Sequence, residues 1–207
     1  MTFWKNIKSD ILKGCEDILR PHAYKLVRSR SSFEKPTATG RLIVLMNFVS
    51  SDVGNRFVRI RCGVRNNEIE RIVSRTLSTD KGYHPSTITI GTDCDTVWLL
   101  NTQEEQASTI KGLQSYIQDV ALPFLEKDYS LQDFSALLNV TDAEGRPVYR
   151  VGMGIRFWQR GLAAAKLAGD ERFDDLKRHY TDHVRVLSNG FYFPEFEKCL
   201  RYIDEYA

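Results

Sequence analysis

The sequence predicts an α+β fold: an antiparallel sheet flanked by helices, with a mainly helical C-terminal portion. Two apolar segments of different pattern indicate the sheet. Every residue of Leu42–Met46 is apolar, so both faces of this segment are apolar. Arg56–Cys62 alternates instead and places Val58, Ile60 and Cys62 on one face. Because successive strand side chains point to opposite faces, we expect a buried central strand followed by a half-buried one. Regular helical spacing of apolar residues before and after these strands indicates the helices.

The N-terminal elements follow from these patterns. Thr2 can cap a first helix, which Arg20-Pro21 ends, since the residue before a proline disfavours the helical conformation. Three extended segments come next, separated by short turn-like links, and this order favours an antiparallel meander. The segments are Tyr24–Phe33, Leu42–Val49 and Arg56–Val64.

The central elements are shorter and more varied. Asn66-Asn67 marks the start of a short helix. Thr76–Pro85 is loop-like, and two short strands are expected after it, at Thr87–Ile90 and Val97–Leu100.

Capping patterns predict the helices that follow. Thr102 and Glu105 form a capping box before a long amphipathic helix, which Pro123 should kink or finish. Ser130 and Asp133 suggest a further cap.

Thr141–Pro147 is the clearest boundary in the chain, and we expect a sheet domain over residues 1–140 and a helical portion over 148–207, packed together as one unit. Helices are expected in that portion at residues Phe157–Ala168, Phe173–Leu187 and from Pro194 onward.

The charge distribution limits the classes of function. Residues 1–100 hold 16 Lys and Arg against 10 Asp and Glu, net +6, while residues 101–207 hold 13 against 17, net −4. This is less basic than a dedicated nucleic-acid binder, but it allows a local basic face.

The four widely separated cysteines form no Cys-x-x-Cys pair and are expected to be free thiols in a reducing compartment. With no signal-peptide pattern and no run of 18 apolar residues, we expect a cytoplasmic protein with no membrane partner.

The sequence assigns no catalytic residue, metal or cofactor. His179 and His183 lie one helical turn apart with Asp175 before them, which makes these three the candidates for a metal site. A structural role is favoured, because no third ligand can be fixed and no glutamate follows His179. Cys94 lies between two aspartates, whose charges raise a thiol pKa and so oppose nucleophilic activity. An enzyme assembled from distant residues stays an alternative.

A basic surface with an aromatic residue is the strongest candidate for function. Arg59 and Arg61 share a strand face with Phe57, a combination that suits acidic proteins, phosphates or stacked bases. The alternative is that these arginines interact within the protein, where they pair with Glu34 or lie under acidic C-terminal helices. The candidate binding residues are Arg28, Arg30, Arg56, Phe57, Arg59 and Arg61.

The first 125 residues also resemble a bacterial family of domains of unknown function. The residues that carry the resemblance are the helix Phe3–Leu19, Tyr24-Lys25-Leu26 with Phe33, the strand Arg56–Val64 and the helix Ile110–Leu125. The resemblance implies a small cytoplasmic α+β protein without an established activity. By analogy, such domains are candidates for immunity proteins that neutralise toxins by binding.

Three hypotheses follow, in this order. The first is a binding protein, toxin-neutralising or otherwise, that pairs its arginines with an acidic protein partner. The second is a nucleic-acid-binding protein that uses the same face. The third is an enzyme that acts on a small anionic ligand.

Overall fold

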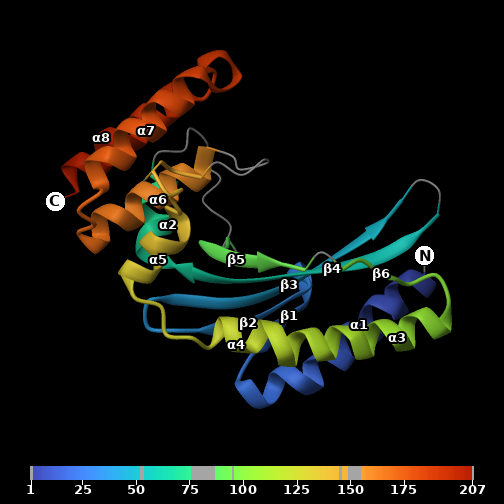
Figure 1. Ribbon diagram of the computed structural model, residues 1–207. Coiled ribbons are helices and arrows are strands. Elements are labelled where there is room, and N and C mark those ends of the chain that lie inside the picture. Colours follow the sequence, from blue (N-terminus) through green and yellow to red (C-terminus); the bar gives the residue numbers. More distant parts are fainter. Residues whose placement is uncertain are drawn as a thin grey trace. The chain divides into compact units, whose positions relative to one another are not determined.

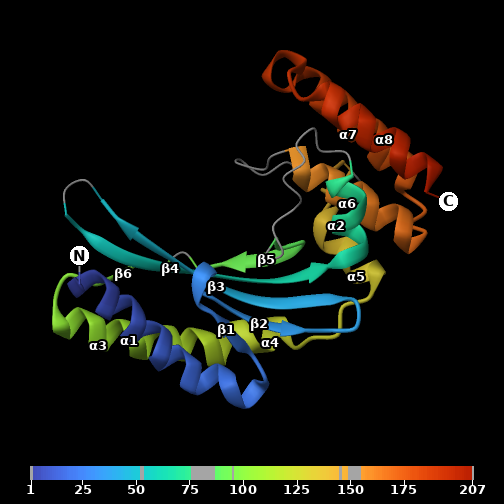
Figure 2. The same cartoon turned by 180° about the vertical axis from the view of Figure 1, so that it is seen from behind.

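The computed structural model describes residues 2–51, 54–75, 87–94, 96–144, 146–148 and 155–206 (Figures 1 and 2). An antiparallel sheet and a set of helices that includes the C-terminal ones confirm the α+β prediction. The chain divides into two compact units. Unit 1 contains Met1–Arg65 and Gly91–Lys127, and unit 2 contains Asn66–Ile90 and Asp128–Ala207.

The strands of the sheet follow the order β1-β2-β3-β4-β5. Strand β6 also pairs with β4, along the same edge of β4 as β5. Pairing of β1 with β2, β2 with β3 and β4 with β6 is antiparallel. The strands are β1 (Lys25–Val27), β2 (Ser32–Pro36), β3 (Gly40–Ser50), β4 (Arg56–Asn66), β5 (Ile90–Asp93) and β6 (Trp98–Leu99). The predicted central strand and its alternating neighbour are therefore confirmed as β3 and β4.

Three helices of unit 1 lie on one face of this sheet (Figures 1 and 2). They are α1 (Thr2–Leu19), α3 (Gln103–Tyr116) and α4 (Leu122–Leu125). Ile7, Ile11 and Cys15 of α1 are buried, and α1 packs against α3. Val58, Ile60 and Cys62 of β4 are also buried, with at most 1% of their surface exposed. These residues form the core of unit 1.

The first extended segment differs from its prediction. The chain does not continue as one strand from Tyr24 to Phe33. Instead, β1 is followed by the 3-10 turn η2 (Arg28–Arg30), and Ser31 has a left-handed φ of 51°. The chain then returns so that Leu26 pairs with Phe33. Neither glycine nor proline marks this turn, which is why the sequence pattern did not reveal it.

The long helix before Pro123 also differs in detail. The chain passes from α3 through the π-helical turn η3 (Ile117–Ala121) directly into α4, with Pro123 in the first turn of α4. Proline has no N–H to donate to the preceding turn, and a π turn allows the helix to continue without that bond. The predicted capping box of Thr102 and Glu105 is confirmed.

Unit 2 consists of helices around α6 (Ile155–Ala168), which contacts α2, α5, α7 and α8. These helices are α2 (Asn67–Ser74), α5 (Leu131–Leu138), α7 (Phe173–Val186) and α8 (Phe193–Glu205). The predicted caps at Asn66 and Ser130 are confirmed: Asn66 accepts hydrogen bonds from the amides of Glu68 and Ile69, and Ser130 accepts one from Asp133.

A chain of buried hydrogen bonds joins three helices of unit 2. The Tyr180 hydroxyl donates to Asn139 Oδ1 at 2.9 Å, and Asn139 Nδ2 donates to the carbonyl of Gly161 at 2.9 Å. Ser135 continues the chain to Asp170 with a hydrogen bond of 2.7 Å. Because buried polar groups are costly when unpaired, these bonds fix how α5, α6 and α7 pack.

The division of the chain at Thr141–Pro147 stays a prediction, because compact units are not by themselves independently folding domains. Thr141 and Pro147 pair as an isolated bridge. The loop predicted at Thr76–Pro85 lies outside the described residues. Among the helices of the described ranges, none is both long and apolar enough to cross a membrane.

Candidate functional site

The face of the sheet away from α1 and α3 brings together three of the predicted binding residues, Phe57, Arg59 and Arg61. Alternation along β4 places them opposite the buried Val58 and Ile60, and both arginines are exposed. The guanidinium of Arg59 lies 5.4 Å from the centre of the Phe57 ring. This distance is typical of a cation–π contact, which fixes the orientation of Arg59 beside an apolar surface.

These two arginines line a concave surface of unit 1 with a volume of about 470 Å³, which we call the arginine groove. Its lining residues are Leu45, Asn47, Arg59, Ile60, Arg61, Cys94 and Val97. Val97 is 40% exposed, and Leu99, which pairs with Phe57, is 46% exposed. The groove therefore combines two positive charges with the exposed side chain of Val97, and Leu99 and the half-buried Phe57 lie on the same face of the sheet beside it.

Arg56 does not belong to this groove. Its guanidinium lies 5.5 Å from the centre of the Trp4 ring of α1, which places Arg56 on the helix side of the sheet. Arg28 is exposed in the turn η2, away from β4 in sequence and in strand order. These two predicted residues, like Arg30, thus lie at other positions on unit 1.

Arg30 neutralises a buried carboxylate. Its guanidinium donates to Glu34 Oε1 at 2.8 Å, and Arg41 donates to Glu34 Oε2 at 2.5 Å. Burial alone raises the pKa of Glu34, but hydrogen bonds from Ser32, Arg41 and Arg30 outweigh it and lower that pKa. Glu34, the acidic partner considered for Arg59 and Arg61 from the sequence, is thus held by two other arginines.

Sequence reasoning missed several residues of the groove, Asn47, Cys94 and Val97 among them. They come from three segments that meet only through long-range strand pairing, and the amide of Cys94 donates to the carbonyl of Ile60 at 3.3 Å. Alternation within one strand predicts which residues share its face. It does not predict which residues of other strands lie beside them.

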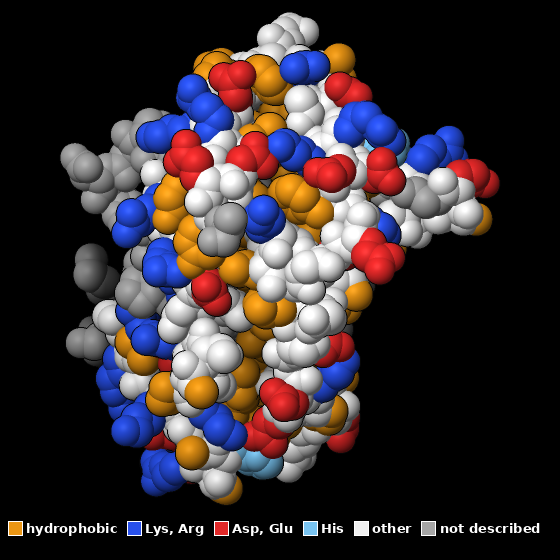
Figure 3. Space-filling model, turned by 90° about the vertical axis from the view of Figure 1, so that its left-hand side faces the viewer, with side chains coloured by type: hydrophobic (Ala, Val, Ile, Leu, Met, Phe, Trp, Pro, Cys, Tyr) orange, Lys and Arg blue, Asp and Glu red, His pale blue; other side chains and the backbone are white. Residues whose placement is uncertain are grey.

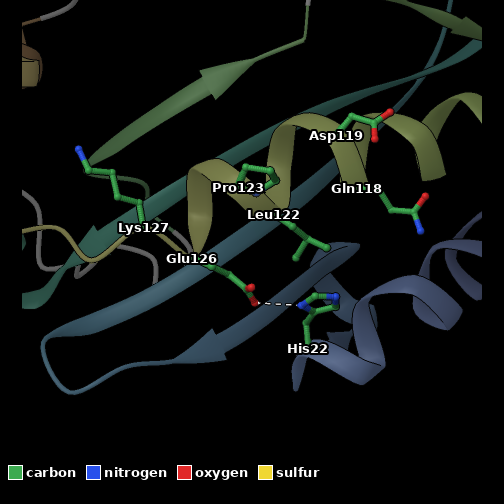
Figure 4. A pocket seen from close by; sticks show the side chains of 7 residues that line it. All are labelled: His22, Gln118, Asp119, Leu122, Pro123, Glu126 and Lys127. Carbon is green, nitrogen blue, oxygen red and sulfur yellow. Dashed lines mark hydrogen bonds and ion pairs between the residues drawn. The ribbon is translucent and has the colours of Figure 1, made fainter.

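A second concave surface of unit 1, with a volume of about 600 Å³, lies between η1 (Arg20–His22) and α4 (Figure 4). His22 Nδ1 lies 3.2 Å from Glu126 Oε1, and Lys35 Nζ donates to the same oxygen at 3.2 Å. Figure 4 shows Asp119 and Lys127 pointing away from this pair. Glu126 is thus occupied by two cationic partners, His22 and Lys35, and the two other charged side chains of this surface point elsewhere, so the arrangement is that of an exposed ion-pair cluster.

The candidate metal residues lie on α7 without forming a ligand set. Asp175 pairs with Arg178 at 2.8 Å, and the ring of His183 packs edge-on against Trp158 with centroids 4.8 Å apart. Burial lowers the pKa of His183. Within the described ranges, no three His, Cys, Asp or Glu side chains are grouped to hold a metal ion. A role for His179 in metal binding gains no support from this arrangement.

The face of the molecule drawn in Figure 3 carries both signs of charge. Figure 3 shows basic, acidic and hydrophobic side chains intermingled on one side of the molecule. Mixed charge of this kind is typical of ordinary protein surfaces.

No family model, curated protein or solved structure matches this chain. The resemblance to a bacterial family of domains of unknown function therefore stays a prediction.

Proposed function

We propose that this chain is a cytoplasmic binding protein that recognises an acidic surface of a protein partner through its arginine groove. A toxin-neutralising protein of the immunity type belongs to this class. The observation that carries the proposal is the position of Arg59 and Arg61 in a concave surface beside exposed apolar side chains. Arginine pairs with carboxylates in a bidentate manner, and it is enriched together with aromatic residues at the energetic centres of protein interfaces.

The apolar rim favours a protein partner over nucleic acid. Val97 and Leu99 would be covered by an apolar patch of a partner, which contributes to affinity at any ionic strength. A nucleic acid would depend mainly on phosphate contacts and would dissociate as salt displaces it.

The test is affinity capture of partners from a lysate of the source cells, with tagged wild type and with the double variant Arg59→Glu/Arg61→Glu. We expect a stoichiometric protein that wild type retains at moderate salt and the double variant loses. Lys111→Glu is the matched control, because it reverses an exposed charge on α3 of the same unit. Circular dichroism must show that each variant keeps the fold.

Equal retention of the partner by wild type and the double variant contradicts the assignment of the groove. Retention of nucleic acid that is lost as salt rises favours the second hypothesis.

The concave shape of the groove favours one further candidate, a small anionic ligand. Titration of the protein with inorganic phosphate, followed by chemical shifts of the amides of Arg59 and Arg61, tests it. Saturable shifts that Arg59→Glu abolishes would support this candidate over a protein partner.

A further inference from the structure

Strand β3 is longer than its neighbour β2. Residues Arg41–Leu45 of β3 pair with β2, with Arg41 opposite Pro36 and Leu45 opposite Ser32. The amide of Met46 then donates to the carbonyl of Ser31 at 3.0 Å. Beyond Met46, β3 runs on to Ser50 together with β4. In the described part of the chain, no strand pairs with this end of β3 on the side where β2 would lie. Figure 1 shows the β3–β4 hairpin extending past β2.

The direction of the backbone groups along this free edge follows from alternation. The N–H of Met46 points toward the β2 side, and the N–H of Ser51 points toward β4, where it donates to Asn55. Since the N–H and C=O of one residue point the same way and alternate along a strand, those of Phe48 and Ser50 point outward. The edge thus offers two donors and two acceptors to another strand.

Natural edge strands are usually protected from pairing by charged side chains, proline or bulges. The segment Asn47-Phe48-Val49-Ser50 has neither charge nor proline. Phe48 is held in place by Trp4 of α1, with ring centroids 6.3 Å apart. The ammonium of Lys8 of α1 also lies 5.5 Å from the centre of the Phe48 ring, so the charge nearest this edge comes from the helix and is positive. An ordered edge whose own residues are uncharged is a template for an added strand.

The free edge lies next to the arginine groove, because Asn47 is part of both. A strand added to β3 would lie about 4.8 Å from it, with every second side chain on the face of Arg59 and Arg61. Asn47 is short, so a long acidic side chain of the added strand can reach across it toward the long arginine side chains. We propose that the occupant of this edge is an extended acidic segment of a partner protein, which pairs with β3 and places its carboxylates in the arginine groove; this rests on the proposed function.

A second copy of this chain fits the edge less well. Two β3 edges paired about a two-fold axis would put two sets of Arg59 and Arg61 on the same face of the joined sheet. Asn47–Ser50 contributes no acidic residue to offset this like charge. Charge complementarity therefore selects an acidic partner.

The test uses a fluorescein-labelled eight-residue peptide of alternating Glu and Val with blocked ends. Its two controls are a peptide of alternating Lys and Val and the acidic peptide N-methylated at every second residue. Ser50→Pro removes an outward N–H without removing a donor to β4, and Ser50→Ala is the matched control that keeps it. Binding is followed by fluorescence anisotropy.

We expect the acidic peptide to bind wild type and Ser50→Ala equally, and to bind Ser50→Pro and Arg59→Glu at least tenfold more weakly. The lysine and N-methylated peptides should bind at least tenfold more weakly to wild type. Bound acidic peptide should slow hydrogen exchange at the amides of Phe48 and Ser50 at least tenfold. Because the N-methylated peptide tests the same backbone bonds, the experiment does not depend on Ser50→Pro folding.

Each contrary result has a separate meaning. If the N-methylated peptide binds as well as the acidic one while Arg59→Glu still weakens binding, the edge is not used and only this inference fails. If Arg59→Glu has no effect, the arginine groove is not the binding site and the proposed function fails with it. Absence of peptide binding overturns the inference, as does a dimer in sedimentation that Ser50→Pro dissociates, since the occupant would then be a second copy.

Discussion

Several arginines of this chain neutralise buried or half-buried carboxylates. Arg30 and Arg41 hold Glu34, Arg160 holds the fully buried Glu70 at 2.7 Å, and Arg172 holds Asp170 at 2.7 Å. A lone buried carboxylate would be strongly destabilising, so these arginines are committed to the fold. The count of basic residues in the sequence therefore overstates the charge that is available to a partner. Arg59 and Arg61 are exposed and line the arginine groove.

Asp170 is expected to stabilise unit 2 in a pH-dependent way. Hydrogen bonds from Arg172 lower its pKa, and the bond from Ser135 acts in the same direction against the opposing effect of burial. Because the native pKa lies below the unfolded value of about 3.9, this stabilisation is present above pH 4 and is lost as pH falls through the native pKa. We expect Asp170→Asn to lower the free energy of unfolding by about 1.5–3 kcal/mol at pH 7.

Urea denaturation of wild type and Asp170→Asn between pH 7 and pH 3 measures this effect. The difference between the two proteins should shrink below pH 4. Glu171→Gln is the control, because Glu171 is the exposed neighbour. A difference that stays constant down to pH 3 would contradict the lowered pKa of Asp170.

The cysteines are expected to differ in reactivity according to burial. Burial raises the pKa of Cys15 to about 12, and Cys62 and Cys199 are also buried, whereas Cys94 is partly exposed in the arginine groove. Since the thiolate is the reactive form, iodoacetamide at pH 8 should modify Cys94 first in the native protein. Mass spectrometry after short labelling checks this, and unfolding in urea should make all four react. Rapid native labelling of Cys15 would show that its thiol is not buried.

At the scale of elements, long regular patterns in the sequence predicted strand faces and helix starts, whereas a short irregular turn could not be predicted. The alternation of β4 predicted which face carries Arg59 and Arg61, and capping residues predicted where α2, α3 and α5 begin. The turn at Arg28–Arg30 was missed, because strands of three to five residues are too short for periodicity to reveal. The lining of the groove could not be predicted, since it depends on how separate strands align.

Helix packing in unit 2 requires a glycine at position 161. A Cβ at this position would clash with Oδ1 of Asn139, the atom that also accepts the Tyr180 hydroxyl hydrogen bond. Gly161→Ala should therefore destabilise the protein by roughly 1–3 kcal/mol, although alanine favours a helix interior by about 1 kcal/mol over glycine.

A double-mutant cycle tests the cause. Asn139→Ala alone should also be destabilising, by about 1–3 kcal/mol, because it leaves the buried Tyr180 hydroxyl without its acceptor. In the Asn139→Ala background, however, Gly161→Ala should be neutral or stabilising, since the clashing oxygen is gone. Chemical denaturation of the four proteins gives the coupling. Additive losses would mean that the clash is not with Asn139.

At the scale of the whole molecule, the two units are discontinuous in sequence, and this division was not predictable. Helix α2 follows β4 directly, yet it belongs to the helical unit. Its Glu70 bonds to Arg160 and to Thr89, and the guanidinium of Arg71 lies 5.4 Å from the centre of the Tyr206 ring. These contacts join residues that are up to 135 positions apart. A local pattern carries no signal of such pairing.

The two units should lose protection separately, because each has its own buried core and such regions often open as distinct cooperative units. Asn139→Ala weakens only bonds within unit 2. Native-state hydrogen exchange of this variant should therefore show faster exchange for the amides of Leu162 in α6 and Ile72 in α2, with unchanged exchange for Val44 in β3 and Ile60 in β4. Equal acceleration at all four amides would mean that the chain opens as one unit. If Ile72 instead follows Val44 and Ile60, α2 opens with the sheet, as the division into residues 1–140 and 148–207 predicts.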